Sequence, residues 1–128
     1  MSAVVVDTSV WLEFFRGKPL PRLEDALREG LVVLPPVVAA ELLSARLSKA
    51  ERRSLAAFVQ DLPLHPVPLS HWVAVGALRA ELSHKGLSVS TPDAHVAECA
   101  IEAGGLLWST DAIFHKMSRV SALRLFEG

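Results

Sequence analysis

Three short apolar runs, none of which contains a charged residue, constrain the fold more than any other feature of the sequence. They cover residues 3–6, 31–34 and 106–108 and consist mainly of Val and Leu. Such a run is typical of a strand buried on both faces, as the strands of a parallel sheet are. Helical spacing of apolar residues separates the runs. This alternation favours an α/β fold of three layers, α/β/α, with a central parallel sheet, right-handed crossovers and helices on both faces.

The predicted helices have recognisable starts and ends. Thr8 or Ser9 can cap the first, which is apolar almost all round and ends before Gly17. Prolines open several of the others, and glycines close them. We expect helices at residues 10–15, 20–28, 37–47, 49–61, 70–84, 92–103 and 112–118, and short edge strands at residues 64–67 and 123–126.

Composition indicates one folded domain, residues 1–128. The chain is 51% hydrophobic and carries 13 Lys and Arg against 14 Asp and Glu, which excludes a disordered chain and a basic tail. No apolar stretch approaches the roughly 20 residues that cross a bilayer, and the start lacks the pattern of a signal peptide, so we expect a cytoplasmic protein without membrane contact. A mean hydropathy of +0.35 predicts that some apolar surface lies in a protein interface.

The spacing of cysteine and histidine in the sequence does not indicate a metal centre. Cys99 is the only cysteine, so the chain cannot form an internal disulfide. No Cys or His pair stands at a recognised ligand spacing, and we therefore expect no structural zinc site.

Carboxylates, in contrast, are placed at informative positions. Asp7 directly follows the first predicted strand, Asp111 lies three residues beyond the last apolar run, and Asp93 is in the first turn of a helix behind Pro92. Ligands of an open parallel sheet bind at the carboxyl ends of its strands. Each aspartate alone could instead cap a helix or complement its dipole.

Glu41 is the fourth acid of interest. It stands in a predicted helix in which nearly all of the remaining residues are apolar. Burying an ionised carboxylate there would cost several kcal/mol of folding free energy unless the carboxylate had a partner. A distant basic partner is the alternative. Four acids at one sheet edge would repel one another, and a bound cation with oxygen ligands, Mg²⁺ or Mn²⁺, resolves that repulsion.

Together these residues resemble those of the PIN-domain ribonucleases. The resemblance rests on Asp7-Thr8-Ser9-Val10 after a Val-rich strand, Glu41 in an apolar helix, Asp93 leading an Ala-rich helix, and Ser109-Thr110-Asp111. It covers essentially the whole chain, whose size is most similar to that of the VapC toxins of toxin–antitoxin modules. The resemblance implies a Mg²⁺- or Mn²⁺-dependent endoribonuclease, usually a homodimer, that is held inactive by a small VapB-like antitoxin.

Residue by residue, the resemblance makes Asp7, Glu41, Asp93 and Asp111 the catalytic, metal-binding quartet. Ser9 and Ser109 correspond to supporting hydroxyls. Two positions depart from the pattern: Ile113 stands where many relatives have a further Asp, and His95 where many have Ile or Leu. His95 is then a solvated or core histidine, or a residue that touches RNA.

Other surfaces suggest partners. Arg16, Lys18 and Arg46 belong to basic clusters that could contact RNA phosphates, or could be ordinary solvated residues. The apolar flank of the first helix is expected to form part of a groove for the antitoxin.

Two other functions compete with the nuclease. One is a PIN-like module that binds RNA or protein without cutting, and the other is a metal-dependent phosphatase. The phosphatase is disfavoured, because no second Asp lies two residues after Asp7 and no Gly-rich phosphate loop is present.

Overall fold

The computed structural model describes residues 2–127 and has a short parallel sheet at its centre. Strand β1 (Val4–Val6) pairs with β2 (Val32–Val33) and with β3 (Leu106–Trp108), giving the order β2-β1-β3. Both pairings are parallel, with Val4 opposite Val32 and Leu106. The three predicted apolar runs are therefore strands, and the α/β prediction is confirmed.

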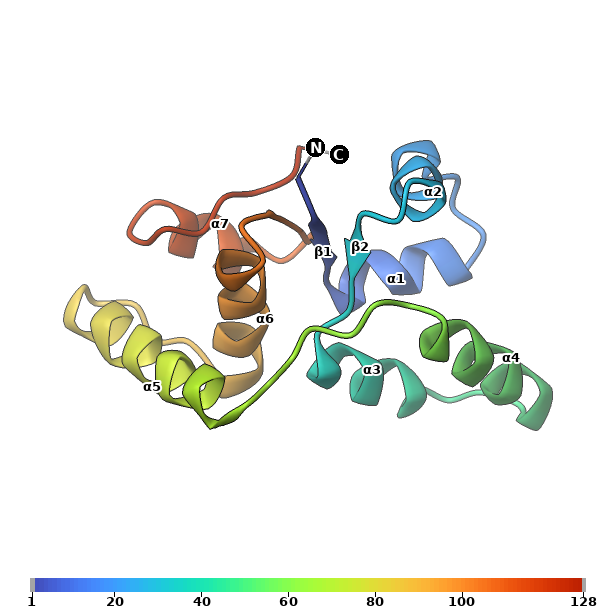
Figure 1. Ribbon diagram of the computed structural model, residues 1–128, viewed down its shortest axis with the longest axis horizontal. Helices are drawn as coiled ribbons and strands as arrows, with labels where there is room; N and C mark the ends of the chain where they lie inside the picture. Colours follow the sequence, from blue (N-terminus) through green and yellow to red (C-terminus); the bar gives the residue numbers. More distant parts are fainter. Residues whose placement is uncertain (1, 128) are drawn as a thin grey trace.

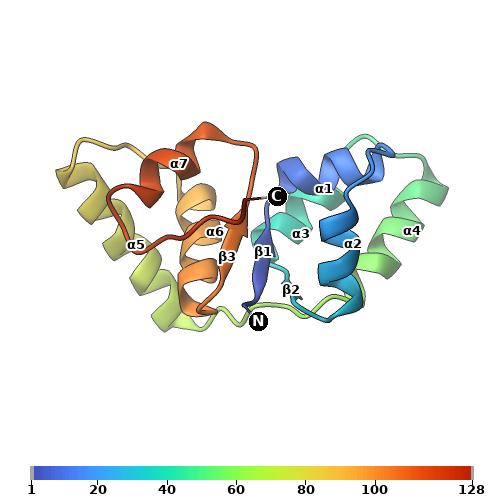
Figure 2. The ribbon, with the colours of Figure 1, turned by 90° about the horizontal axis from the view of Figure 1, so that it is seen from above.

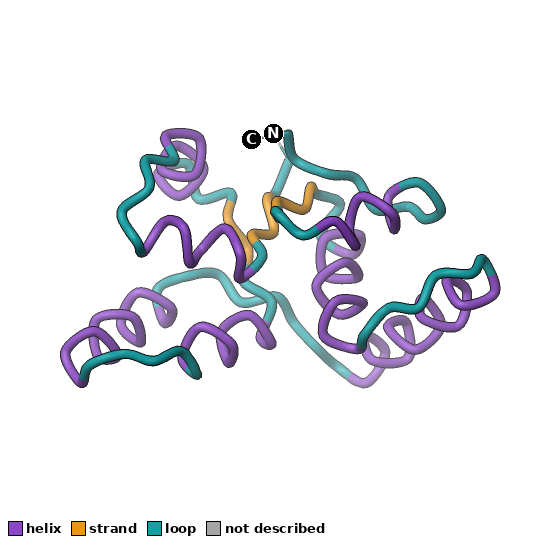
Figure 3. The backbone as a smooth tube through the Cα atoms, turned by 180° about the vertical axis from the view of Figure 1, so that it is seen from behind, coloured by secondary structure: helices purple, strands orange, loops and turns teal. Residues whose placement is uncertain are grey.

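Helices enclose the sheet from two sides. In Figure 2, α5, α6 and α7 lie beyond β3, whereas α1 to α4 lie on the other side of β1. Figures 1 and 3 show the same arrangement, with the strands between the two helical groups. The helices are α1 (Thr8–Phe15), α2 (Pro21–Arg28), α3 (Pro36–Leu43), α4 (Lys49–Gln60), α5 (Leu69–His84), α6 (Thr91–Glu102) and α7 (Ala112–Ser118).

Local signals explain most helix ends. Ser48 starts α4 with a capping box, in which the Ser48 hydroxyl accepts from the Glu51 amide and the Glu51 carboxylate accepts from the Ser48 amide. Those bonds lower the pKa of Glu51. Gly86 follows α5 with a φ of 82°, which a residue without Cβ adopts readily.

Three predicted elements differ from the structure. The third helix ends at Leu43 rather than residue 47, because the Ser44 amide closes its last turn and the segment before Ser48 leads into the next cap. Residues 64–67 contribute only an isolated bridge between Leu34 and Leu64, in a segment whose prolines lack amide donors. Residues 123–126 likewise form one bridge, between Leu107 and Leu125.

The core is formed by β1 together with the inner faces of the helices. Trp11, Phe114 and Met117 are among its largest fully buried side chains, and all three residues of β1 are buried. No helix within residues 2–127 is long and apolar enough to cross a membrane.

Candidate functional site

Asp7 stands where the sheet meets α1. Its amide donates to the Trp108 carbonyl over 2.9 Å, which extends the pairing of β1 and β3 by one residue. The carboxylate is 9% exposed, and its Oδ2 accepts from the hydroxyls of Ser9, at 3.0 Å, and Ser109, at 2.8 Å. Asp7 occupies the N-cap position but makes no side-chain cap bond, so the helix-capping alternative is wrong for this side chain.

Asp111 is joined to Asp7 through Ser109. The Ser109 hydroxyl accepts from the Asp111 amide over 3.0 Å while donating to Asp7. Oδ1 of Asp111 accepts from the Ile113 amide over 3.1 Å and caps α7, as the alternative interpretation predicted. Capping engages one carboxylate oxygen, and the side chain as a whole is exposed, so capping leaves room for a second role.

Asp93 lies in the first turn of α6, where the Ser90 hydroxyl accepts from its amide over 3.2 Å. Burial raises the pKa of its carboxyl, a hydrogen bond with Ser90 opposes that rise, and the negative charges of Asp111 and Asp7 add to it. Charges act in this way only across short distances. The helix start therefore brings Asp93 to the sheet edge that holds the other two aspartates.

Glu41 does not match the expectation of a buried carboxylate. It is exposed, although Val38 and Leu42 of the same two-turn helix are buried. Oε1 of Glu41 accepts from the Thr8 hydroxyl over 2.8 Å. Since Thr8 follows Asp7 directly, this bond places the fourth acid beside the same end of β1. The predicted desolvation cost is wrong, but the predicted proximity is present.

None of these four carboxylates forms an ion pair with a Lys, Arg or His within residues 2–127. In the same part of the chain, the side-chain partners of the buried Asp7 carboxylate are the hydroxyl groups of Ser9 and Ser109. Carboxylate and hydroxyl oxygens are the donors that hard divalent cations such as Mg²⁺ and Mn²⁺ prefer. The chemistry of the donor set thus fits the ion that the sequence predicted.

A separate, open apolar groove of about 840 Å³ lies between α1, α3 and α4. Phe15 is 43% exposed there, and its ring meets that of Phe58 edge-on at 5.4 Å between centroids. Arg16 and Arg46 also line the groove, whereas Lys18 pairs with Glu13 at 3.0 Å. The flank of the first helix is therefore uncovered by the sheet, as the apolar sequence of the helix predicted.

A second cluster of potential ligand side chains was not predicted from the sequence. His65, His71 and Cys99 are buried, and one potential ligand atom from each lies within 4.8 Å of the other two. His95 is fully buried beside them and stacks on Trp72, so it is a core histidine. The spacing of His95 and Cys99, four residues apart on one helix face, was the signal that could have found the cluster.

Comparison with known proteins places this fold. A sequence model of the PIN domain matches residues 4–120. VapBC2 from Rickettsia felis, solved with a promoter DNA fragment, has a TM-score of 0.78, 21% identity and coverage of 97% of both chains. DNA-bound VapBC from Salmonella typhimurium has a TM-score of 0.74 and 22% identity, with 98% of both chains covered. VapBC-5 from Mycobacterium tuberculosis has a TM-score of 0.72 and 23% identity, with 100% of both chains covered. No curated protein sequence matches significantly.

The family match and the geometry agree on the same framework. The matched region contains the parallel sheet and all four acids, and the three similar solved structures each cover at least 97% of the chain. The chain belongs to the PIN domain family.

Proposed function

We propose that this protein is a divalent-metal-dependent endoribonuclease that acts as the toxin of a VapBC-type module. The observation that carries the proposal is the buried Asp7 carboxylate, which lies at the carboxyl end of β1 and pairs with no cationic side chain among residues 2–127. Hydroxyls from two chain segments fix it, and the charges of Asp93 and Asp111 lie near it. A site that concentrates negative charge in this way favours a cation over an organic anion.

Asp7, Asp93 and Asp111 are the residues that would hold Mg²⁺ or Mn²⁺, directly or through water. Such an ion supplies a water of lowered pKa and offsets the charge that develops on the phosphate. Ser9 and Ser109 hold the Asp7 carboxylate in one orientation, with both of their hydrogen bonds on Oδ2. Glu41, exposed and tied to Thr8, is placed to accept a proton or to orient the attacking water.

The proposed reaction is hydrolysis of an RNA phosphodiester by water. The water oxygen bonds to phosphorus, the bond from phosphorus to the 3′ oxygen breaks, and the ends are a 5′-phosphate and a 3′-hydroxyl. The ribose 2′-hydroxyl takes no part, so 2′,3′-cyclic phosphate products would contradict this chemistry. The chain needs no catalytic His or Cys at the carboxylate edge for this reaction.

Cleavage of end-labelled structured RNA tests the proposal. The protein is purified free of any antitoxin and assayed with Mg²⁺ or Mn²⁺, beside EDTA. Asp93→Asn should abolish cutting, whereas Asp61→Asn, which alters an exposed aspartate at the end of α4, should leave the rate unchanged. Absence of cutting on several RNAs by a protein that binds the metal would favour the alternative, a PIN-like module that binds without cleaving.

The groove between α1, α3 and α4 is the surface that we assign to a VapB-like antitoxin. One of the similar structures, VapBC-5 from Mycobacterium tuberculosis, is a member of the VapBC family of toxin–antitoxin systems. The groove offers the exposed ring of Phe15, with Arg16 and Arg46 among the lining residues. An amphipathic partner helix with acidic residues fits that combination of apolar area and positive charge.

A second copy of the chain is assigned to the exposed apolar residues at the start of α5. Leu69 is 78% exposed and Val73 is 64% exposed, one turn apart on the same helix. Adjacent apolar residues this exposed are typical of an interface. The homodimer that the family resemblance implies would cover them.

A further inference from the structure

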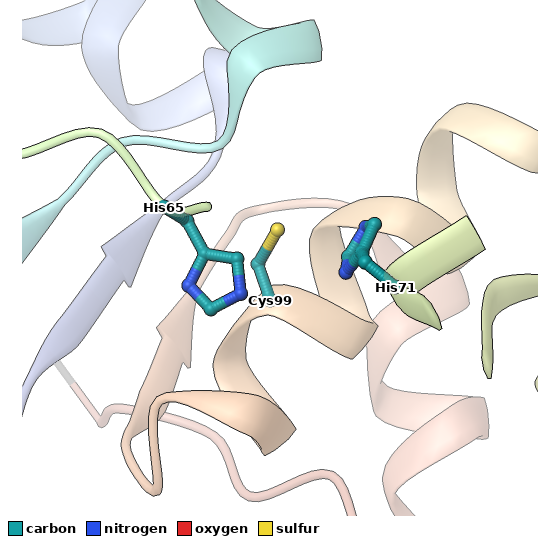
Figure 4. A group of neighbouring side chains, drawn as sticks. All are labelled: His65, His71 and Cys99. Atoms are coloured by element: carbon teal, nitrogen blue, oxygen red, sulfur yellow. The ribbon is translucent and has the colours of Figure 1, made fainter. Parts of the chain in front are cut away.

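A cluster of nitrogen and sulfur ligands lies where the linker between α4 and α5 meets α6. His65 comes from the linker, His71 from the first turn of α5, and Cys99 from the middle of α6. Figure 4 shows the Cys99 side chain between the two imidazole rings. The ligand atoms of the three residues lie within 4.8 Å of one another, and all three side chains are buried. These are the ligand types that Zn²⁺ selects.

Glu102 adds a negative charge to the cluster. Its Oε1 lies 2.8 Å from His65 Nε2 and 2.8 Å from His71 Nδ1, so one carboxylate oxygen joins the two rings. A carboxylate oxygen is also a zinc ligand. Two imidazoles, one thiol and one carboxylate would complete the four-coordinate shell that zinc prefers.

His95 supports the orientation of His71. Its Nδ1 lies 2.7 Å from His71 Nε2, on the side of the ring away from the nitrogen that faces Glu102. A histidine that binds a metal through one ring nitrogen usually hydrogen-bonds through the other, which fixes the ring. The fully buried His95 provides that second contact.

Hydrogen bonding alone explains the histidines but not the cysteine. Each of His65, His71 and Glu102 has partners at 2.8 Å or less. Among the described residues, the Cys99 Sγ contacts only the His95 ring, at 3.8 and 4.0 Å. A soft cation that replaces the thiol proton would give this sulfur a strong partner beside the imidazoles of His65 and His71.

We propose that His65, His71 and Cys99 form a second metal site, which binds Zn²⁺ or a cation of similar softness, with Glu102 as the fourth ligand. When the sulfur–metal bond forms, the Cys99 proton leaves to solvent, and both histidines bind as neutral rings. With bond lengths of about 2.0 to 2.3 Å, tetrahedral ligands lie closer together than 4.8 Å, so small side-chain rotations close the shell. The site differs from the all-oxygen aspartate edge and would clamp the α4–α5 linker onto α6.

Cobalt(II) is the probe for this site, since it takes the place of Zn²⁺ and absorbs visible light. Metal-free full-length protein is titrated with Co²⁺ in excess Mg²⁺. We expect one equivalent to bind, with a thiolate-to-cobalt charge-transfer band and the intense visible bands of a four-coordinate ion. Equimolar Zn²⁺ should remove these bands.

Matched variants separate this site from the carboxylate edge. Cys99→Ser should lose the charge-transfer band, and His65→Gln should weaken Co²⁺ binding at least about tenfold, as loss of a ligand or its support does. Asp93→Asn and the exposed His84→Gln should bind as wild type. Near-ultraviolet circular dichroism establishes folding, and if Cys99→Ser does not fold, His65→Gln decides. Folded wild-type protein without the band, a band kept in folded Cys99→Ser, or a band lost in Asp93→Asn would overturn the proposal.

Discussion

Replacing Ser109 by alanine tests whether the hydroxyls hold Asp7 in place. The Ser109 hydroxyl donates to Asp7 Oδ2 over 2.8 Å, and a hydrogen bond to a charged group contributes about 1.5 to 3 kcal/mol. The Ser9 hydroxyl remains at 3.0 Å, and the exposed Asp111 amide can turn to water. We therefore expect Ser109→Ala to lower the free energy of unfolding by about 2 kcal/mol.

Urea denaturation in EDTA at neutral pH measures this change without interference from bound metal. Ser44→Ala is the control, because it removes a hydroxyl that donates to a helix carbonyl on an exposed surface and should change stability by less than about 0.5 kcal/mol. In an Asp7→Asn background the cost of Ser109→Ala should shrink, since the charge is gone. A loss no larger than that of Ser44→Ala, or the same loss in both backgrounds, would refute the reasoning.

Three further predictions concern the sheet, the groove and the basic residues. Gly105→Ala places a Cβ 2.3 Å from the Ala3 carbonyl oxygen beside the pairing of β1 and β3, and should lower the free energy of unfolding by about 2 to 4 kcal/mol. Gly76→Ala, within α5 and with open space around it, should raise the free energy of unfolding by about 1 kcal/mol. Urea titrations in which the two glycine variants change stability in the same direction would contradict this reasoning. Phe15→Ala should weaken binding of the cognate antitoxin at least tenfold, as measured by calorimetry, and should leave RNA cleavage intact. An unchanged affinity would contradict the assignment of the groove to the antitoxin. If Arg46 contacts an RNA phosphate, Arg46→Ala should reduce the slope of log binding constant against log salt concentration by about one unit. An unchanged slope would contradict a contact between Arg46 and RNA.

The strands and the aspartates were predictable because their signals are local. An uncharged, Val-rich run such as Val4–Val6 indicates a buried strand. Because the carboxyl ends of parallel strands lie at one edge of the sheet, the position of Asp7 directly after this run locates it at that edge. Asp111 follows from the same rule, because it lies three residues beyond β3, whereas Asp93 was located by the proline that opens α6.

The exposure of Glu41 and the histidine cluster could not be predicted in the same way. The apolar neighbours of Glu41 suggested a core helix, but exposure depends on which face α3 turns toward α6 and α1, a property of the assembled fold. His65 and His71 reach Cys99 across about thirty residues only because α5 packs on α6. The two predicted edge strands form single bridges instead, and in residues 64–67 a proline that lacks an amide donor limits the pairing.

Parallel measurement of Mn²⁺ occupancy and RNA cleavage tests the central claim most directly, namely that a cation held by Asp7, Asp93 and Asp111 cuts RNA. Electron paramagnetic resonance of free Mn²⁺ gives the occupancy, and the same samples give the cleavage rate. We predict that the rate rises in step with occupancy, and that Asp93→Asn loses both while Cys99→Ser keeps both. Cutting that persists in EDTA, or in an Asp93→Asn protein with no bound Mn²⁺, would contradict the account.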